Sequence, residues 1–126
     1  MAKILIVDDS EHVRNITSKM LKEGGHAYVT AVNGVDGLSK LHNNTDIDII
    51  LCDVNMPEMD GLTMVSKLEC DTPVIMVTTE TSIDMKIKAK SNGVIAWATK
   101  PFNNNKLLGA IDKILKRGIR SRRSRR

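Results

Sequence analysis

Apolar residues along the chain form three short, nearly continuous runs. They are Ile4–Val7, Ile47–Cys52 and Val74–Val77, and all three are rich in Val, Ile or both. Runs of this length and composition are typical of strands that are buried on both faces of a parallel sheet. Weaker strand candidates are Ala27–Val32 and Val94–Ala98. The pattern therefore predicts five strands.

Segments with helical spacing of apolar residues separate these strands. Two of them follow residues that favour helix N-caps, Ser10 and Asn33, and a third begins with the capping-box segment Thr81–Asp84. The apolar positions of the predicted helices are Val13, Ile16, Met20 and Leu21; Val35, Leu38 and Leu41; Leu62, Val65 and Leu68; and Leu107, Leu108, Ile111, Ile114 and Leu115. Strand and helix alternate five times, which predicts an α/β fold with a parallel sheet and right-handed crossovers.

Length and charge indicate one domain with a distinct basic end. The chain has 126 residues, 41% of them apolar, which is enough for a single core. Its formal charge of +4 arises from residues 117–126, which hold six of the 19 basic residues, so that residues 1–116 carry −2. We expect a domain over residues 1–116 and a disordered, non-functional tail over residues 117–126, because the Arg/Ser composition of the tail cannot form a core.

Cysteine usage and hydropathy favour a cytoplasmic protein. Cys52 and Cys70 have neither metal-ligand spacing nor a disulfide framework. The first apolar run, Ile4–Val7, is too short for a signal peptide or a membrane span. We therefore expect no membrane association.

Polar side chains follow four of the five predicted strands. Asp8 and Asp9 end the first strand, Asp53 ends the third, Thr78 ends the fourth, and Lys100 follows the fifth. Ligands of open α/β sheets bind at the carboxyl ends of the strands, so these five side chains should converge there. Each carboxylate alone has an ordinary alternative role as a helix cap or a solvent-exposed side chain, but all five positions together favour a site.

Crowded carboxylates repel one another, and a hard divalent cation relieves the conflict. A few carboxylate oxygens, with the other coordination positions left to water or phosphate, describe Mg²⁺ better than Ca²⁺. With Mg²⁺ bound, one carboxylate can attack a phosphoryl group and form an acyl phosphate, and Lys100 and Thr78 would contact the phosphoryl oxygens. The sequence thus favours a phosphoacceptor site.

Four segments, in order and on the expected elements, resemble the signature segments of bacterial response-regulator receiver domains. They are Val7–Ser10, Asp53–Gly61, Val77–Glu80 and Lys100–Phe102, and the resemblance extends from Met1 to about Lys116. It implies a flavodoxin-like, CheY-like doubly wound sheet of five parallel strands in the order 2-1-3-4-5, with five helices. It also implies a cis peptide bond between Lys100 and Pro101.

The resemblance further implies a role for each site residue. Asp53 would be the phosphoacceptor. Asp9 and Asp53 would bind Mg²⁺ directly, together with the backbone carbonyl of Asn55, and Asp8 would act mainly through metal-bound water. Thr78 would bond a phosphoryl oxygen, and Lys100 would pair with the phosphoryl group.

The resemblance also implies regulatory roles for three further positions. Asn55 and Glu80 each lie two residues after a site residue, where such pairs tune how water reaches the phosphoryl group. Trp97 stands where the family often has Tyr or another aromatic residue, and it is either an ordinary core tryptophan or a rotamer switch that follows Thr78.

Among receiver domains, the chain looks most like stand-alone, CheY-type chemotaxis regulators. The implied function is a signalling phosphoprotein that catalyses only its own phosphoryl transfer and dephosphorylation. Its partners would be a sensor histidine kinase, the flagellar motor switch protein and a phosphatase. A single-domain phosphorelay or developmental regulator is the alternative.

Functions from other classes have less support. An aspartate-nucleophile phosphatase requires a second Asp two residues after the first, and here that residue is Asn55. Nucleic-acid binding would rest on the basic tail alone.

Overall fold

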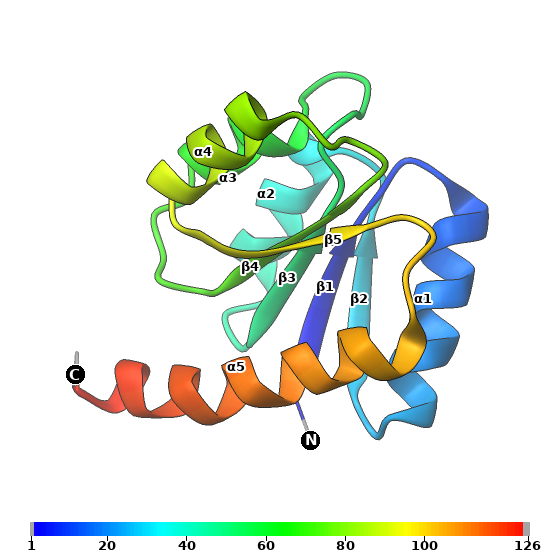
Figure 1. Ribbon diagram of the computed structural model, residues 1–126. Coiled ribbons are helices and arrows are strands. Elements are labelled where there is room, and N and C mark those ends of the chain that lie inside the picture. The colour runs from blue at the N-terminus through cyan, green and yellow to red at the C-terminus, as the bar shows by residue number, and fades with distance from the viewer. Residues whose placement is uncertain (1, 125–126) are drawn as a thin grey trace.

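Strands and helices alternate five times in the computed structural model, which describes the backbone of residues 2–124 and the side chains of residues 2–117 (Figure 1). The strands are β1 (Lys3–Val7), β2 (Ala27–Ala31), β3 (Ile49–Cys52), β4 (Val74–Thr78) and β5 (Val94–Thr99). The helices are α1 (Glu11–Glu23), α2 (Gly34–Asn43), α3 (Gly61–Ser66), α4 (Ile83–Ser91) and α5 (Asn104–Ser124).

All five strands are parallel and lie in the order β2-β1-β3-β4-β5, which confirms the predicted sheet. Val7 pairs with Cys52 and Cys52 pairs with Met76 across the three central strands. Their carboxyl ends therefore lie next to one another, and the residues that follow them meet at one edge of the sheet.

Two apolar layers hold the helices against the sheet. One contains Val7, Ile50 and Cys52 from the strands together with residues of α2, α3 and α4. The other contains Ile4, Ile6 and Ile49, with residues of α1 and α5. Helices α1 and α5 thus cover one face and α2, α3 and α4 the other, as expected for strands whose residues are buried on both sides (Figure 1).

Side-chain caps begin four of the helices. Ser10, Asn33, Asp60 and Ser82 each accept a hydrogen bond from the backbone N–H three residues later. These bonds satisfy one of the N–H groups that a helix leaves without an intrahelical partner. The predicted caps at Ser10 and Asn33 are confirmed.

The third helix is shorter than its apolar spacing predicts. It ends at Ser66, because the N–H groups of Lys67 and Leu68 donate to carbonyls only three residues back, at Met64 and Val65. Leu68 therefore lies beyond the helix, although it still packs against the core.

Helix α5 continues through Ser124, past the position where the sequence predicts a disordered tail. The side chains of residues 118–126, and all of residues 125–126, lie outside the described residues. The expected domain boundary at residue 116 and the expected lack of function of residues 117–126 therefore stay predictions. Within the described part of the chain, no helix is long and apolar enough to cross a membrane.

Candidate functional site

Three carboxylates meet at the carboxyl edge of the sheet, as the sequence predicts. One oxygen atom each from Asp8, Asp9 and Asp53 lies within 4.8 Å of the others. Asp8 and Asp53 are buried, with 3% and 8% of their surface exposed, and Asp9 is exposed. A backbone hydrogen bond joins the ends of β1 and β3, since the N–H of Asp53 donates to the carbonyl of Val7 at 3.0 Å.

The ammonium of Lys100 joins two of these carboxylates. Its Nζ lies 2.6 Å from Oδ2 of Asp8 and 2.8 Å from Oδ2 of Asp53. The backbone N–H of Lys100 donates to the carbonyl of Thr78 at 2.8 Å, which anchors the lysine to the end of β4. The Lys100–Pro101 peptide is cis, as the sequence resemblance implies.

Burial and pairing act against each other in the pKa values of this cluster. Burial raises the pKa of Asp8 above its usual value, although the hydrogen bond from Lys100 opposes the rise. Burial alone would lower the pKa of Lys100, but its hydrogen bonds to Asp53 and Asp8 outweigh this effect, so its pKa is raised. The pair interaction favours both charges, but for Asp8 the effect of burial is larger than the opposing effect of its hydrogen bond from Lys100.

A tight loop after β3 fixes the direction of the Asp53 side chain. Oδ1 of Asp53 accepts a hydrogen bond from the N–H of Val54 at 2.7 Å. The loop closes at Gly61, whose N–H donates to the carbonyl of Val54 at 2.8 Å. A Cβ atom on Gly61 would lie 1.9 Å from the carbonyl oxygen of Asp53, so only glycine fits there.

The backbone of Glu80 connects Thr78 with Trp97. Oγ1 of Thr78, which is fully buried, accepts a hydrogen bond from the N–H of Glu80 at 3.2 Å. The indole Nε1 of Trp97 donates to the carbonyl of Glu80 at 3.0 Å. The side chain of Glu80 lies beside Asn55, with Nδ2 of Asn55 3.5 Å from Oε2 of Glu80.

The donor set fits a hard divalent cation. Carboxylate oxygens from few residues, at an edge of the sheet where Asp9 is open to solvent, suit an ion that keeps part of its water, such as Mg²⁺. The interaction of Lys100 with two of the same carboxylates shows that the cluster stabilises positive charge.

The structure brings together the predicted residues Asp8, Asp9, Asp53 and Lys100, and it places Thr78 at the end of the neighbouring strand. Two residues near the site were not predicted. Gly61 was part of the matching segment but had no assigned role, and Arg14 donates from Nη1 to the carbonyl of Asp8 at 2.9 Å. A helix residue four positions after an N-cap carries no sequence signal for such a contact.

A doubly wound parallel sheet with a buried Asp, further carboxylates and a lysine at its carboxyl edge is the architecture of response-regulator receiver domains. The family model described as "Response regulator receiver domain" matches residues 4–112. The chain therefore belongs to the response-regulator receiver domain family.

Similar proteins include several chemotaxis proteins named CheY. A CheY homolog of Campylobacter jejuni is 38% identical over 122 residues, covering 92% of this chain and 94% of the relative. The crystal structure of CheY4 from Vibrio cholerae has a TM-score of 0.84 and 38% identity, and the match covers 90% of this chain and 98% of that one.

A third similar structure contains bound ligands. It is the CheX-CheY complex with BeF₃ and Mg²⁺ from Borrelia burgdorferi, with a TM-score of 0.85 and 26% identity over 90% of this chain and 88% of that chain.

Proposed function

We propose that this protein is a phosphorylation-activated response regulator in which Asp53 accepts a phosphoryl group from a sensor histidine kinase in the presence of Mg²⁺. The observation that carries the proposal is the position of the Lys100 ammonium, 2.8 Å from Asp53 and 2.6 Å from Asp8. A fixed cation next to a buried carboxylate stabilises the negative charge that a phosphoryl group brings to it.

The transfer exchanges one bond to phosphorus for another. A carboxylate oxygen of Asp53 attacks the phosphorus, an acyl-phosphate P–O bond forms, and the P–N bond to the histidine of the kinase breaks. Asp8, Asp9 and Asp53 would hold Mg²⁺, whose charge offsets the repulsion between the carboxylates and the incoming phosphoryl oxygens. Lys100 exchanges a carboxylate oxygen for a phosphoryl oxygen and stays charged throughout.

Thr78 and Glu80 connect phosphorylation of Asp53 with Trp97 on β5. The Thr78 hydroxyl turns its proton toward the phosphoryl group and draws the Glu80 N–H with it. Because the Glu80 carbonyl accepts from the indole of Trp97, this movement changes the environment of Trp97. In this scheme Trp97 is the switch residue, and Asn55 and Glu80 set how readily water reaches the acyl phosphate.

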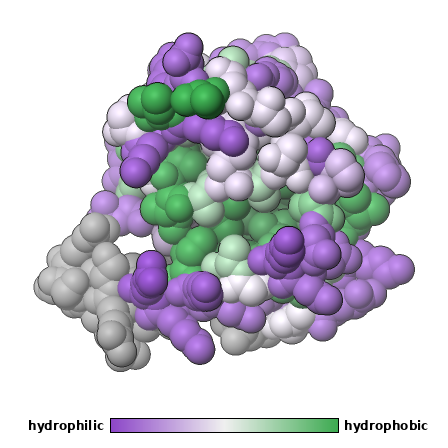
Figure 2. Space-filling model, viewed as in Figure 1, coloured by the Kyte–Doolittle hydropathy of each residue, from purple (hydrophilic) through white to green (hydrophobic). Residues whose placement is uncertain are grey.

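The surface that responds is the face formed by α4, β5 and α5. Its middle, between α4 and α5, is apolar (Figure 2). Grooves of about 540 and 410 Å³ flank Trp97, one toward α4 and the other toward α5. Ile83, Ile87 and Ile95 are more than half exposed on this face, which suits an apolar segment of a partner.

The names of the relatives favour chemotaxis as the setting. The cytoplasm as the location, and the flagellar motor switch protein as the partner of this face, are part of the proposal and follow from the sequence resemblance. A phosphatase would be a further partner, as the sequence resemblance implies, and the similar Borrelia structure shows a CheY protein bound to a second protein, CheX.

A small-molecule phosphodonor tests the proposal without the kinase. We expect acetyl phosphate with Mg²⁺ to add one phosphoryl group to the wild-type protein, as read by intact mass, and none to Asp53→Asn. Removing Mg²⁺ with a chelator should also abolish the addition. The matched control is Asp48→Asn, an aspartate just before β3, which should be labelled like the wild type. Equal labelling of Asp53→Asn would contradict the proposed acceptor.

A further inference from the structure

A cationic groove lies between α1 and the edge strand β2, and one of its lining residues, Arg14, also contacts the backbone of Asp8 in the carboxylate cluster. It has a volume of about 430 Å³, and none of its lining residues is acidic. Three of them, Arg14, Lys19 and Lys22, are cations from α1. Residues 1–116 carry a formal charge of −2, so the positive charge of this groove is opposite in sign to the net charge of the domain.

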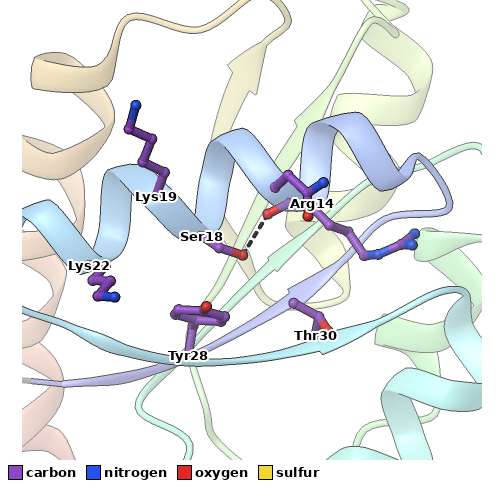
Figure 3. Close-up of a pocket in the computed structure, with 7 residues that line it drawn as sticks. Arg14, Ser18, Lys19, Lys22, Tyr28 and Thr30 are labelled. Atoms are coloured by element: carbon purple, nitrogen blue, oxygen red, sulfur yellow. Dashed lines mark hydrogen bonds between the residues drawn. The ribbon is translucent and has the colours of Figure 1, made fainter.

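Hydroxyl groups and an aromatic ring complete the lining of this α1–β2 groove. Figure 3 shows Tyr28 and Thr30 on β2, facing Ser18 of α1. Lys22 lies toward the Tyr28 end and Arg14 toward the Thr30 end, whereas Lys19 points away from β2. The groove thus has an aromatic end and a hydroxyl-and-guanidinium end.

The guanidinium of Arg14 is already held in place for an anion. Its Nη1 donates to the carbonyl of Asp8 at 2.9 Å, which fixes the side chain and leaves other N–H donors for a ligand. Planar guanidinium donors match phosphate oxygens in pairs. Because the side chain is ordered before binding, less conformational entropy is lost on binding.

Two observations argue against a long or peptide ligand. Nζ of Lys40 donates to the outward carbonyl of Thr30 at 2.8 Å, and a lysine on that edge opposes addition of a peptide strand to β2. Glu11 and Glu23 are exposed at the two ends of α1 and would repel a polyanion that runs along the helix. A compact ligand with phosphate and an aromatic group fits both ends of the groove.

We propose that the α1–β2 groove binds a nucleotide, with its base on the Tyr28 ring and its phosphates on Arg14 and Thr30. Tyr28 is 42% exposed, so one part of its ring is open to stacking. Lys19 and Lys22 add positive potential at the rim, which favours a ligand with more than one phosphate. The site does not use Asp53.

Titration of the full-length, ¹⁵N-labelled protein with ADP, pyrophosphate and adenosine tests this site. A chelator is present, so that phosphate binding at the carboxylate cluster is suppressed. We expect ADP to bind with a dissociation constant at or below roughly 1 mM and to shift amide signals in residues 14–22 and 28–30. Pyrophosphate should bind more weakly, and adenosine more weakly still.

Two variants separate the two ends of the groove. Arg14→Gln should weaken ADP and pyrophosphate about tenfold each. Tyr28→Leu should weaken ADP about tenfold and leave pyrophosphate unchanged, because only ADP carries a base. The control Lys67→Gln removes an exposed lysine at the end of α3 and should bind ADP like the wild type.

Three results would overturn the proposal. The first is a set of amide shifts confined to residues 117–126, which would mean that the basic tail binds ADP. The second is an equal affinity of Arg14→Gln and the wild type for ADP. The third is tighter binding of an acidic peptide than of ADP.

Discussion

Replacing Thr78 with Val should disconnect Asp53 from Trp97 without removing either residue. In the structure, Oγ1 of Thr78 and the indole of Trp97 bind the same residue, Glu80, at its N–H and at its carbonyl respectively. Valine keeps the shape of threonine but provides no hydroxyl. Neither a bond to the phosphoryl group nor the bond from Glu80 can then form at this position.

The magnitude follows from the hydrogen bonds that are exchanged. A hydrogen bond from Thr78 to a charged phosphoryl oxygen contributes about 1.5–3 kcal/mol, whereas the neutral bond between Trp97 and Glu80 contributes about 1 kcal/mol. The difference, on the order of 0.5–2 kcal/mol, shifts a two-state population about 2-fold to 30-fold. Such a shift is large enough to see in an ensemble measurement.

The fluorescence of Trp97, the only tryptophan in the chain, reports the change directly. We expect beryllofluoride with Mg²⁺ to change the emission of the wild type and to change that of Thr78→Val much less. Thr79→Val is the matched control, since Thr79 is the exposed neighbour, and it should respond like the wild type. Equal responses of Thr78→Val and the wild type, with binding of beryllofluoride established separately, would refute the coupling.

Three further predictions concern stability. Lys100→Gln leaves two buried carboxylates without their cation, so it should lower the free energy of unfolding in urea by about 3 kcal/mol when Mg²⁺ is absent. Mg²⁺ should stabilise this variant more than the wild type, and no difference in either measurement would argue against the ion pairs. Gly61→Ala puts a Cβ 1.9 Å from the Asp53 carbonyl and should lower stability by at least about 3 kcal/mol, whereas Gly109→Ala, with open space around its Cβ, should not be destabilising. Deleting residues 118–126 should change thermal stability by less than about 0.5 kcal/mol and leave Mg²⁺ affinity unchanged; a larger loss would show that the tail packs on the domain.

The strands and the carboxylate cluster could be predicted from the sequence because each has a strong local signal. The runs Ile4–Val7 and Val74–Val77 are apolar on both faces, and the polar residues that end such runs must meet where parallel strands end together. The third helix was predicted less well, because Leu68 continues the apolar spacing although the backbone has already turned into 3₁₀-type bonds.

The contacts of Glu80 and Arg14 could not be predicted in the same way. Both run between a side chain and a backbone carbonyl, from Trp97 to Glu80 and from Arg14 to Asp8. A carbonyl is present at every residue, so the sequence does not indicate which one a donor will reach. The path of the loop decides this, and loop paths depend on the packing of the whole domain.

The most direct test of the account is to locate the phosphoryl group on the chain. After reaction with acetyl phosphate and Mg²⁺, borohydride reduces an acyl phosphate of aspartate to homoserine, and peptide mass spectrometry identifies the residue. The account predicts homoserine at position 53, with Asp8 and Asp9 unchanged. Homoserine at position 8 or 9, or a phosphoryl group retained on a serine or threonine, would contradict it.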